Sequence, residues 1–140
     1  MNTAANPFVS VIIVNFNGEE YLTRCLDSVL KNKYLNFEIL MVDNASTDES
    51  LQVAQEAFGA DPRLRIIKND ANMGFSGGNN IGFTYSKGEY IVFLNNDTLV
   101  DPEWLVTLVS ALENDPTIGL AQSKILSIGG DKIQTAGWLF

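Results

Sequence analysis

Three short polar segments, each directly after an apolar run, contain the side chains of this sequence that could do chemistry. They are residues 15–18 (NFNG), 43–46 (DNAS) and 95–98 (NNDT). Carboxylate and amide oxygens are the ligands that hard cations such as Mg²⁺ and Mn²⁺ prefer. Asn, Asp and Ser are also common turn and cap residues, so one such segment alone favours a structural role. Three of them at one edge of a sheet favour a binding site instead.

Asp97 is the strongest single candidate for a metal ligand. It comes shortly after the apolar run YIVFL of residues 90–94, and a buried strand there would fix its position. A lone carboxylate in that place could coordinate a cation that bridges two phosphates. The alternative is that Asp97 caps the turn that leads to Pro102. The residues alone leave both roles open.

Asp43 lies at the tip of the second expected strand, the position at which dinucleotide enzymes hold a ribose. However, no G-x-G-x-x-G segment follows the first strand and no Walker loop occurs, which disfavours a nicotinamide enzyme. We expect Asp43 to contact a ligand rather than the core. On that view, Asp43→Ala weakens nucleotide binding and leaves the fold intact.

A glycine-rich segment, residues 72–82 (NMGFSGGNNIG), precedes the fourth expected strand. Glycine permits positive φ and close backbone approach, and the N-terminus of a following helix could meet an anion. A flexible surface loop is the alternative reading of the same composition.

Composition excludes several classes of chemistry, because the chain has no histidine and a single cysteine, Cys25. These counts rule out Ser-His-Asp and Cys-His nucleophiles, His-ligated zinc and an intramolecular disulfide. Any metal must be held by oxygen ligands, which indicates Mg²⁺ or Mn²⁺. A formal net charge of −8 disfavours nucleic-acid binding. A cation could still bridge a carboxylate to a phosphorylated small molecule.

The elements that must position these residues are short β-rich runs alternating with helical patterns. Apolar runs predict strands at residues 9–14, 37–42, 64–68 and 90–94, and a further strand within 118–122. Apolar residues at helical spacing, and a glycine-rich stretch ahead of one helix, predict helices that begin near residues 22, 46, 79 and 101. Ser46 and Glu49 would form a capping box, and Asp101 would be an N-cap. Gly129, Gly130 and Asp131 predict the turn of a hairpin within 124–135.

Strand and helix alternation of this kind predicts one α/β domain over residues 1–140, an open and mostly parallel sheet flanked by helices. In such sheets ligands bind beyond the carboxyl ends of the strands, at the switch point. No apolar run is long enough to span a bilayer, and residues 1–8 lack the features of a signal peptide. We therefore expect no transmembrane segment in this chain and a cytoplasmic location.

Four segments occur in a characteristic order: residues 9–18 (VSVIIVNFNG), 41–50 (MVDNASTDES), 72–83 (NMGFSGGNNIGF) and 93–98 (FLNNDT). Together they resemble the family 2 glycosyltransferases, and most of all the branch that includes rhamnosyltransferases and other bacterial cell-surface polysaccharide enzymes. The similarity runs from about residue 9 to residue 119. It implies the GT-A fold, a Rossmann-like sheet that binds a nucleotide sugar.

The resemblance also implies the residues of the site. Those expected to bind the nucleotide sugar are Val14, Asn15, Asn17, Asp43, Asn72, Gly74, Gly78, Asn79, Asn95 and Asn96. The family's metal-binding Asp-x-Asp motif matches residues 95–97, in which Asn95 replaces the first aspartate. Since the metal usually depends most on the last aspartate, Asp97 is the expected ligand of a divalent cation, Mg²⁺ or Mn²⁺. The substitution implies a weaker or less strictly required metal.

The function implied is transfer of a sugar, with inversion, from a nucleotide-diphosphate sugar to a glycan or lipid-linked acceptor in cell-surface polysaccharide synthesis. The family's catalytic base is an acidic residue of the acceptor-binding half, well downstream of the metal motif. Asp115 and Asp131 are the last acidic candidates, in an expected helix exit and a hairpin turn. We therefore expect the donor-binding part of a GT-A domain, truncated before the acceptor half, with the base beyond residue 140. The full-length protein would be cytoplasmic, with the inner face of the membrane as an alternative position.

Three other functions remain as alternatives. One is a stand-alone sugar-nucleotide-binding module without turnover. A nucleotidyltransferase would be expected to carry a basic glycine-rich loop near the N-terminus, and residues 15–20 have no basic residue. A purely structural protein is disfavoured by the polar clusters at one sheet edge. The apolar tail of Trp138, Leu139 and Phe140 predicts an interface with another segment or partner.

Overall fold

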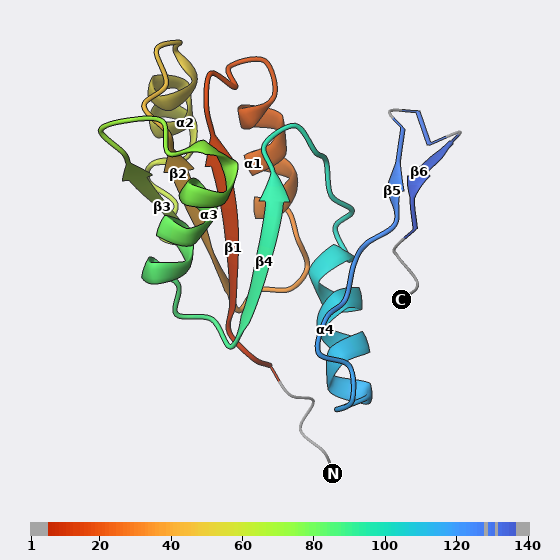
Figure 1. Ribbon diagram of the computed structural model, residues 1–140. Coiled ribbons are helices and arrows are strands. Elements are labelled where there is room, and N and C mark those ends of the chain that lie inside the picture. The colour runs from red at the N-terminus through yellow and green to blue at the C-terminus, as the bar shows by residue number, and fades with distance from the viewer. Residues whose placement is uncertain (1–5, 128, 131, 137–140) are drawn as a thin grey trace.

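A four-stranded parallel sheet forms the centre of the computed structural model, which describes residues 6–127, 129–130 and 132–136 (Figure 1). Its strands are β1 (Val9–Asn15), β2 (Phe37–Asp43), β3 (Leu64–Lys68) and β4 (Tyr90–Asn95), in the order β3-β2-β1-β4. The central strand β1 pairs with β2 on one side and β4 on the other. All four carboxyl ends therefore lie at one edge.

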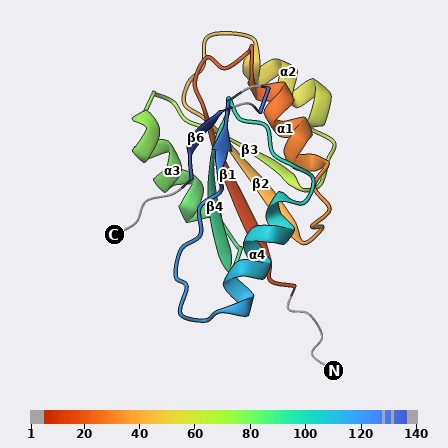
Figure 2. The same ribbon diagram turned by 90° about the vertical axis from the view of Figure 1, so that its right-hand side faces the viewer.

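Helices cover both faces of the sheet, as Figure 2 shows. α1 (Leu22–Leu30), α2 (Ser50–Phe58) and α4 (Trp104–Asn114) share a face, and α3 (Gly74–Tyr85) lies opposite. Right-handed crossovers account for this, because the chain moves outward from β1 to β3 and then returns across the sheet to β4. The direction of winding thus reverses between β1 and β4, which makes that gap the switch point.

The main core lies between the sheet and α1, α2 and α4. Val9, Val11 and Ile13 of β1 are fully buried there and Ile12 is fully buried on the other face, which confirms a central strand covered on both faces. A smaller cluster around Ile12 lies under α3. The fourth strand is less buried than its apolar run predicts, and Phe93 is 56% exposed. The reason is that β4 lies at the sheet edge, whereas α3 packs on β1 and β2.

The glycine-rich segment is helical, and the flexible-loop alternative is wrong. α3 begins at Gly74, five residues before the predicted start at Asn79. Glycine inside this helix allows close packing on the sheet. A Cβ on Gly78 would lie 2.7 Å from a Val14 methyl carbon, and one on Gly82 would lie 2.5 Å from an Ile12 methyl carbon. Tertiary packing has therefore overridden the poor helix propensity of glycine.

Other boundaries differ from the predictions in smaller ways. α2 begins at Ser50 without a side-chain cap, so the capping box of Ser46 and Glu49 is wrong; the Ser46 hydroxyl donates to Asp43 instead. Similarly, α4 begins at Trp104, and Asp101 accepts from the backbone of Glu103 in the turn before it. Residues 118–122 form no strand. In the described part of the chain, no strand pairs with these residues, and a strand needs such pairing.

The predicted hairpin is confirmed, with β5 (Ile125–Leu126) antiparallel to β6 (Ile133–Thr135). Gly129 and Gly130 have φ of 101° and 75°, a region that favours glycine. Asp131 and the tail of Trp138, Leu139 and Phe140 lie outside the described residues. In Figure 1 the hairpin stands apart from the sheet, beyond α4. No helix in the described part of the chain is long and apolar enough to cross a membrane.

Candidate nucleotide-sugar site

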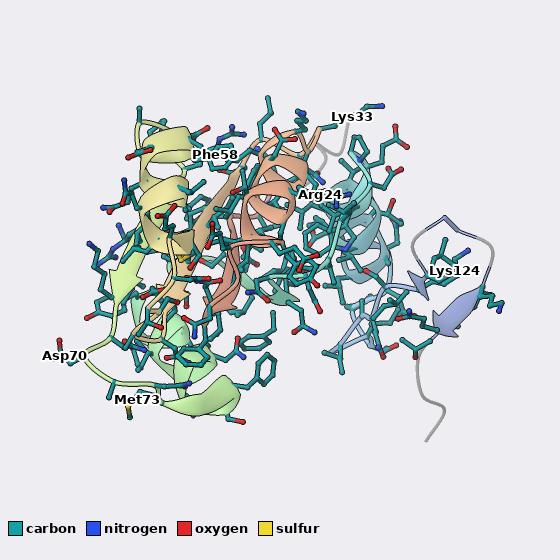
Figure 3. All side chains as sticks on the ribbon, turned by 90° about the horizontal axis from the view of Figure 1, so that it is seen from above. Arg24, Lys33, Phe58, Asp70, Met73 and Lys124 are labelled. Atoms are coloured by element: carbon teal, nitrogen blue, oxygen red, sulfur yellow. The ribbon has the colours of Figure 1, made fainter. Side chains whose placement is uncertain are left out.

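An open depression of about 400 Å³ lies at the switch point between β1 and β4. Its lining residues are Val14, Phe75, Asn95, Asn96 and Asp97. Figure 3 looks down on this edge of the sheet, with Met73 on the loop into α3 and Arg24 of α1 on the opposite face. Four of the residues predicted from the sequence are therefore brought together here. They occupy the place at which open α/β sheets bind ligands.

Asp97 is exposed at the rim of this depression, on a turn that hydrogen bonds within the turn and to α1 hold in place. The Thr98 hydroxyl donates to the Asn95 carbonyl at 2.7 Å, and the same carbonyl accepts from Cys25 Sγ at 3.5 Å. Ser28 Oγ accepts from the Val100 backbone N–H at 3.2 Å, which anchors the far end of the turn to α1. No hydrogen bond among the described residues occupies the Asp97 carboxylate.

The depression fits a cation that shares its ligands with phosphates rather than one held by protein alone. Within the described residues, no group of three His, Cys, Asp or Glu side chains could hold a metal. Asp97 is the one acidic side chain among the lining residues. A lone carboxylate with neighbouring amide oxygens suits Mg²⁺ or Mn²⁺, which commonly completes its coordination with phosphates and water.

The negative charge of Asp97 influences two neighbouring groups of α1 and its preceding turn. The pKa of Tyr21 is raised chiefly by its hydrogen bond to Glu20, and Asp97 adds to that shift. Burial raises the pKa of the Cys25 thiol to about 11, outweighing its hydrogen bonds to Thr98, and Asp97 again adds to the shift. Cys25 is therefore a neutral thiol at physiological pH, unsuited to metal binding or nucleophilic attack.

Asp43 is buried in a polar network, with only 2% of its surface exposed. Its Oδ1 accepts from the Ser46 hydroxyl at 2.6 Å and from Asn15 Nδ2 at 3.1 Å, and its Oδ2 accepts from the Ser46 backbone N–H at 3.1 Å. This geometry does not fit the expectation that Asp43 contacts a ligand rather than the folded interior. Its carboxylate organises the loop after β2.

Asn15 is the centre of the same network and is fully buried. Its Nδ2 lies 3.1 Å from Asp43 Oδ1, 2.9 Å from Ser50 Oγ and 3.1 Å from Ser46 Oγ. Its Oδ1 accepts from Asn96 Nδ2 at 2.9 Å. The side chain predicted to line the nucleotide pocket is thus fully engaged by protein, and it joins the loop after β2 to the turn that carries Asp97.

Asn17 joins the loop after β1 to the loop after β2 by hydrogen bonds. Its Oδ1 accepts from the Thr47 backbone N–H at 2.8 Å, and its own N–H donates to Ser46 Oγ at 3.0 Å. The residue has φ of 52°, the left-handed conformation that asparagine tolerates better than most residues. A further hydrogen bond joins the same two loops: the Asp48 carboxylate accepts from the Glu19 backbone N–H at 2.9 Å.

The predicted residues of the glycine-rich segment lie at the start of α3 and within it. Asn72 is exposed and accepts from the Gly74 backbone N–H at 2.8 Å, while Gly74 has φ of 70°. Asn79 is 8% exposed and donates to the Phe75 carbonyl at 3.0 Å, within the helix. None of these four predicted residues lines the depression, although Gly78 packs on Val14, which does.

Phe75 and Asn44 lie in segments that the sequence singled out, but neither was among the residues expected to form the site. Phe75 lines the depression and is 64% exposed; an aromatic residue among glycines was the available signal. Asn44 is buried and donates to the Gly74 carbonyl at 3.0 Å, while its Oδ1 accepts from Asn69 Nδ2 at 2.7 Å. An asparagine ends or directly follows each of the four strands, and this repetition could have indicated a polar network along the edge.

Comparison with known proteins agrees with this geometry. A 34% identical relative is an uncharacterized glycosyltransferase of Haemophilus influenzae, matched over 80% of this chain and 35% of its own length. Among solved structures, the mannosyltransferase PcManGT from Pyrobaculum calidifontis, in complex with GDP-Man and Mn²⁺, has a TM-score of 0.77 at 26% identity. That match covers 83% of this chain and 35% of the mannosyltransferase chain. S. aureus TarS 1-349 has a TM-score of 0.72 at 25% identity, covering 84% and 39%.

The chain thus spans little more than a third of each of these proteins. The sequence model of one family, described as glycosyl transferase family 2, matches residues 10–137, which is nearly the whole chain. The parallel sheet, its switch-point depression and the likeness to these structures agree with the GT-A fold. The chain belongs to glycosyl transferase family 2.

Proposed function

We propose that this chain binds the nucleotide-diphosphate sugar donor of a glycosyltransferase, with a divalent cation held by Asp97. The observation that carries the proposal is the position of Asp97 in the depression, exposed and bonded to nothing else among the described residues. A cation bound at Asp97, Mg²⁺ or Mn²⁺, would neutralise the diphosphate and stabilise the charge that develops on it as the sugar departs.

The other lining residues support a nucleotide sugar as the ligand. Val14 and Phe75 present apolar surface on which a sugar or base can pack, beside the amides of Asn95 and Asn96. An apolar wall with a few polar groups is typical of small-molecule sites. The mannosyltransferase with a similar fold was solved with GDP-Man and Mn²⁺, and by analogy we propose a related ligand pair for this chain.

The finer points of the function are also proposals. We propose transfer with inversion to a glycan or lipid-linked acceptor in cell-surface polysaccharide synthesis, by a full-length protein located in the cytoplasm or at the inner face of the membrane. Direct displacement needs a base for the acceptor hydroxyl as well as stabilisation of the leaving diphosphate. The residues of the depression supply the second requirement, and we propose that a base outside this depression supplies the first.

Calorimetric titration with UDP, TDP and GDP sugars, each with and without Mn²⁺, tests this proposal. We expect one of them to bind, and Mn²⁺ to tighten its binding. Asp97→Asn should remove most of that Mn²⁺-dependent gain, because the carboxylate supplies the charge that a hard cation needs. Asn95→Ala should reduce the gain less, and Asn95→Asp should increase it.

Asp70→Asn is the matched control, since it removes the same charge from an exposed aspartate on the loop before α3 (Figure 3). It should leave the Mn²⁺-dependent gain unchanged. If Asp97→Asn and Asn95→Ala have equal effects, the metal is held elsewhere. If no sugar nucleotide binds the folded chain, the proposed function is wrong.

A further inference from the structure

One hydrogen bond joins the two polar loops that flank the depression, and its direction is fixed by a buried charge. Asn96 Nδ2 donates to Asn15 Oδ1 at 2.9 Å. On the other side of Asn15, the Nδ2 atom lies 3.1 Å from Asp43 Oδ1. A carboxylate can only accept a hydrogen bond. Asp43 therefore sets which way the Asn15 amide faces, and Asn15 Oδ1 is left to accept from Asn96.

Gly18 makes room for this bond. A Cβ on Gly18 would lie 2.3 Å from Asn15 Oδ1 and 2.3 Å from Asn96 Nδ2, which are the two atoms that the bond joins. The residue does not have positive φ, so an alanine there would meet no backbone strain. The added methyl group of Gly18→Ala should therefore push Asn15 Oδ1 and Asn96 Nδ2 apart without changing the local backbone conformation.

The bond also ties the Asp97 turn to β1 by a side-chain contact, one residue beyond the last pair of the β1–β4 ladder, Val14 with Asn95. The other attachments that we identify come from α1, through Cys25 to the Asn95 carbonyl and Ser28 to the Val100 N–H. Asn96 directly precedes Asp97 in this turn. Without the bond from Asn15, Asn96 would lose the side-chain contact that holds it to β1, and only the strand ladder up to Asn95 and the contacts from α1 would hold the turn.

We propose that Asn15 and Asn96 are positioning residues: their hydrogen bond, oriented by Asp43, holds Asp97 in place to receive the cation of a nucleotide diphosphate. This inference rests on the proposed function and adds to it a positioning role for the buried Asn15 amide and the half-buried Asn96 amide. Groups that orient metal ligands in this way commonly change metal affinity by about 10- to 100-fold when they are removed.

The experiment measures nucleoside diphosphate binding to the 140-residue chain in the presence and absence of Mn²⁺, for UDP and GDP separately. We expect Asn96→Ala and Gly18→Ala each to reduce the Mn²⁺-dependent gain in affinity by about tenfold. Binding without Mn²⁺ should change much less. Asn32→Ala is the matched control, since Asn32 is also buried and its side chain makes two hydrogen bonds, one of them to the Asp101 carbonyl in the turn before α4. It should lower stability and leave the Mn²⁺-dependent gain unchanged.

Nuclear magnetic resonance of the side-chain amides supplies a readout that does not depend on nucleotide binding. In the folded chain, the Asn96 amide protons should exchange slowly, and Gly18→Ala should speed their exchange. If the chain binds neither diphosphate but the amide signals behave as expected, the proposed function fails and the hydrogen bond stands; the positioning role then falls with the function. If Mn²⁺ tightens binding equally in the wild-type chain, Asn96→Ala and Gly18→Ala, the positioning role is wrong while the proposed function stands.

Discussion

The two aspartates of the site have different environments, and this difference separates their roles. Asp43 is 2% exposed and accepts three hydrogen bonds from Asn15 and Ser46. Asp97 is exposed at the rim of the depression and accepts none from the described residues. A carboxylate whose oxygens are already engaged can shape a site, whereas an unengaged one can bind a cation.

We predict that Asp43→Ala lowers the stability of the fold as well as nucleotide affinity. The substitution removes the charged acceptor that the Asn15 amide, the Ser46 hydroxyl and the Ser46 N–H share, and it leaves the Ser46 N–H without an acceptor, at a cost of about 2 to 3 kcal/mol. Urea unfolding followed by circular dichroism measures it, with Asp70→Ala as the exposed control. An unfolding midpoint equal to that of the wild-type chain would show that the network contributes little to stability.

Cys25 gives a prediction for alkaline pH. Burial raises the pKa of its thiol from 9.0 to about 11 in the folded chain. Between these values the unfolded chain releases the proton and the folded chain retains it. Stability is therefore full below pH 9 and falls as the pH rises toward 11, by about 2 to 3 kcal/mol.

The variant Cys25→Ala isolates this effect from the other groups that titrate in the same range. It should be less stable at pH 7, because it loses buried volume, but its stability should decline less steeply between pH 9 and 11. Unfolding midpoints measured at intervals of half a pH unit for both chains provide the comparison. Parallel curves for the two proteins would mean that Cys25 does not titrate in this way.

At the level of elements, α3 depends on glycine for its position. Gly82 lies against Ile12 and Val42 of the sheet, and a Cβ there would come within 2.5 Å of an Ile12 methyl carbon and 3.2 Å of a Val42 methyl carbon. Both neighbours are fully buried and have little room to move. The first turn of the same helix presents Phe75 to the depression, so the fit of α3 on the sheet also sets one wall of the site.

We therefore predict that Gly82→Ala destabilises the chain by about 1 to 3 kcal/mol, although alanine is the better helix former. Gly119→Ala is the matched control, because a Cβ at Gly119 would have no neighbour within 4 Å. Urea unfolding of both variants tests this. A Gly82→Ala chain as stable as Gly119→Ala would show that α3 can move away from the sheet without cost.

The sequence predicted the strands better than it predicted α3. Apolar runs bounded by polar residues mark β1 to β4 to within one residue at either end, because burial on the sheet selects them directly. The start of α3 could not be read in the same way. Its glycines disfavour a helix locally, and they are explained only by the side chains of β1 and β2 beneath them.

The location of the site was also predictable, but its internal bonding was not. Parallel strands bring their carboxyl ends to one edge, so the pattern alone places Asn15, Asp43 and Asp97 near one another. Which of them is buried depends on the pairing of Asn15 with Asp43 and on the loops that fold over them. That register and those loop conformations have no simple sequence signal, and they explain why Asp43 was expected to be accessible.

At the scale of the whole molecule, the depression proposed to bind the donor has no second carboxylate among its lining residues in the described structure. Asp97 is the one acidic residue that lines the depression, and Asp43 is buried behind it. Asp115, an earlier candidate base, has its Oδ1 occupied by the Thr117 hydroxyl at 2.6 Å and by the Thr117 N–H at 2.9 Å, beyond α4. A residue that binds the cation cannot at the same time deprotonate an acceptor.

We predict that this 140-residue chain binds a sugar nucleotide but transfers no sugar to an acceptor. A depression without a positioned base forfeits about 10²- to 10⁴-fold in rate, and an unaligned acceptor costs more. Slow hydrolysis of the donor can persist, because water needs less positioning than a sugar hydroxyl. The measurement is incubation of the chain with radiolabelled donors and candidate acceptors, beside any longer product of the same reading frame. Transfer by the 140 residues at the rate of the longer protein would contradict the prediction, and Asp43, Asp115 and Asp131 would then have to be tested as the base.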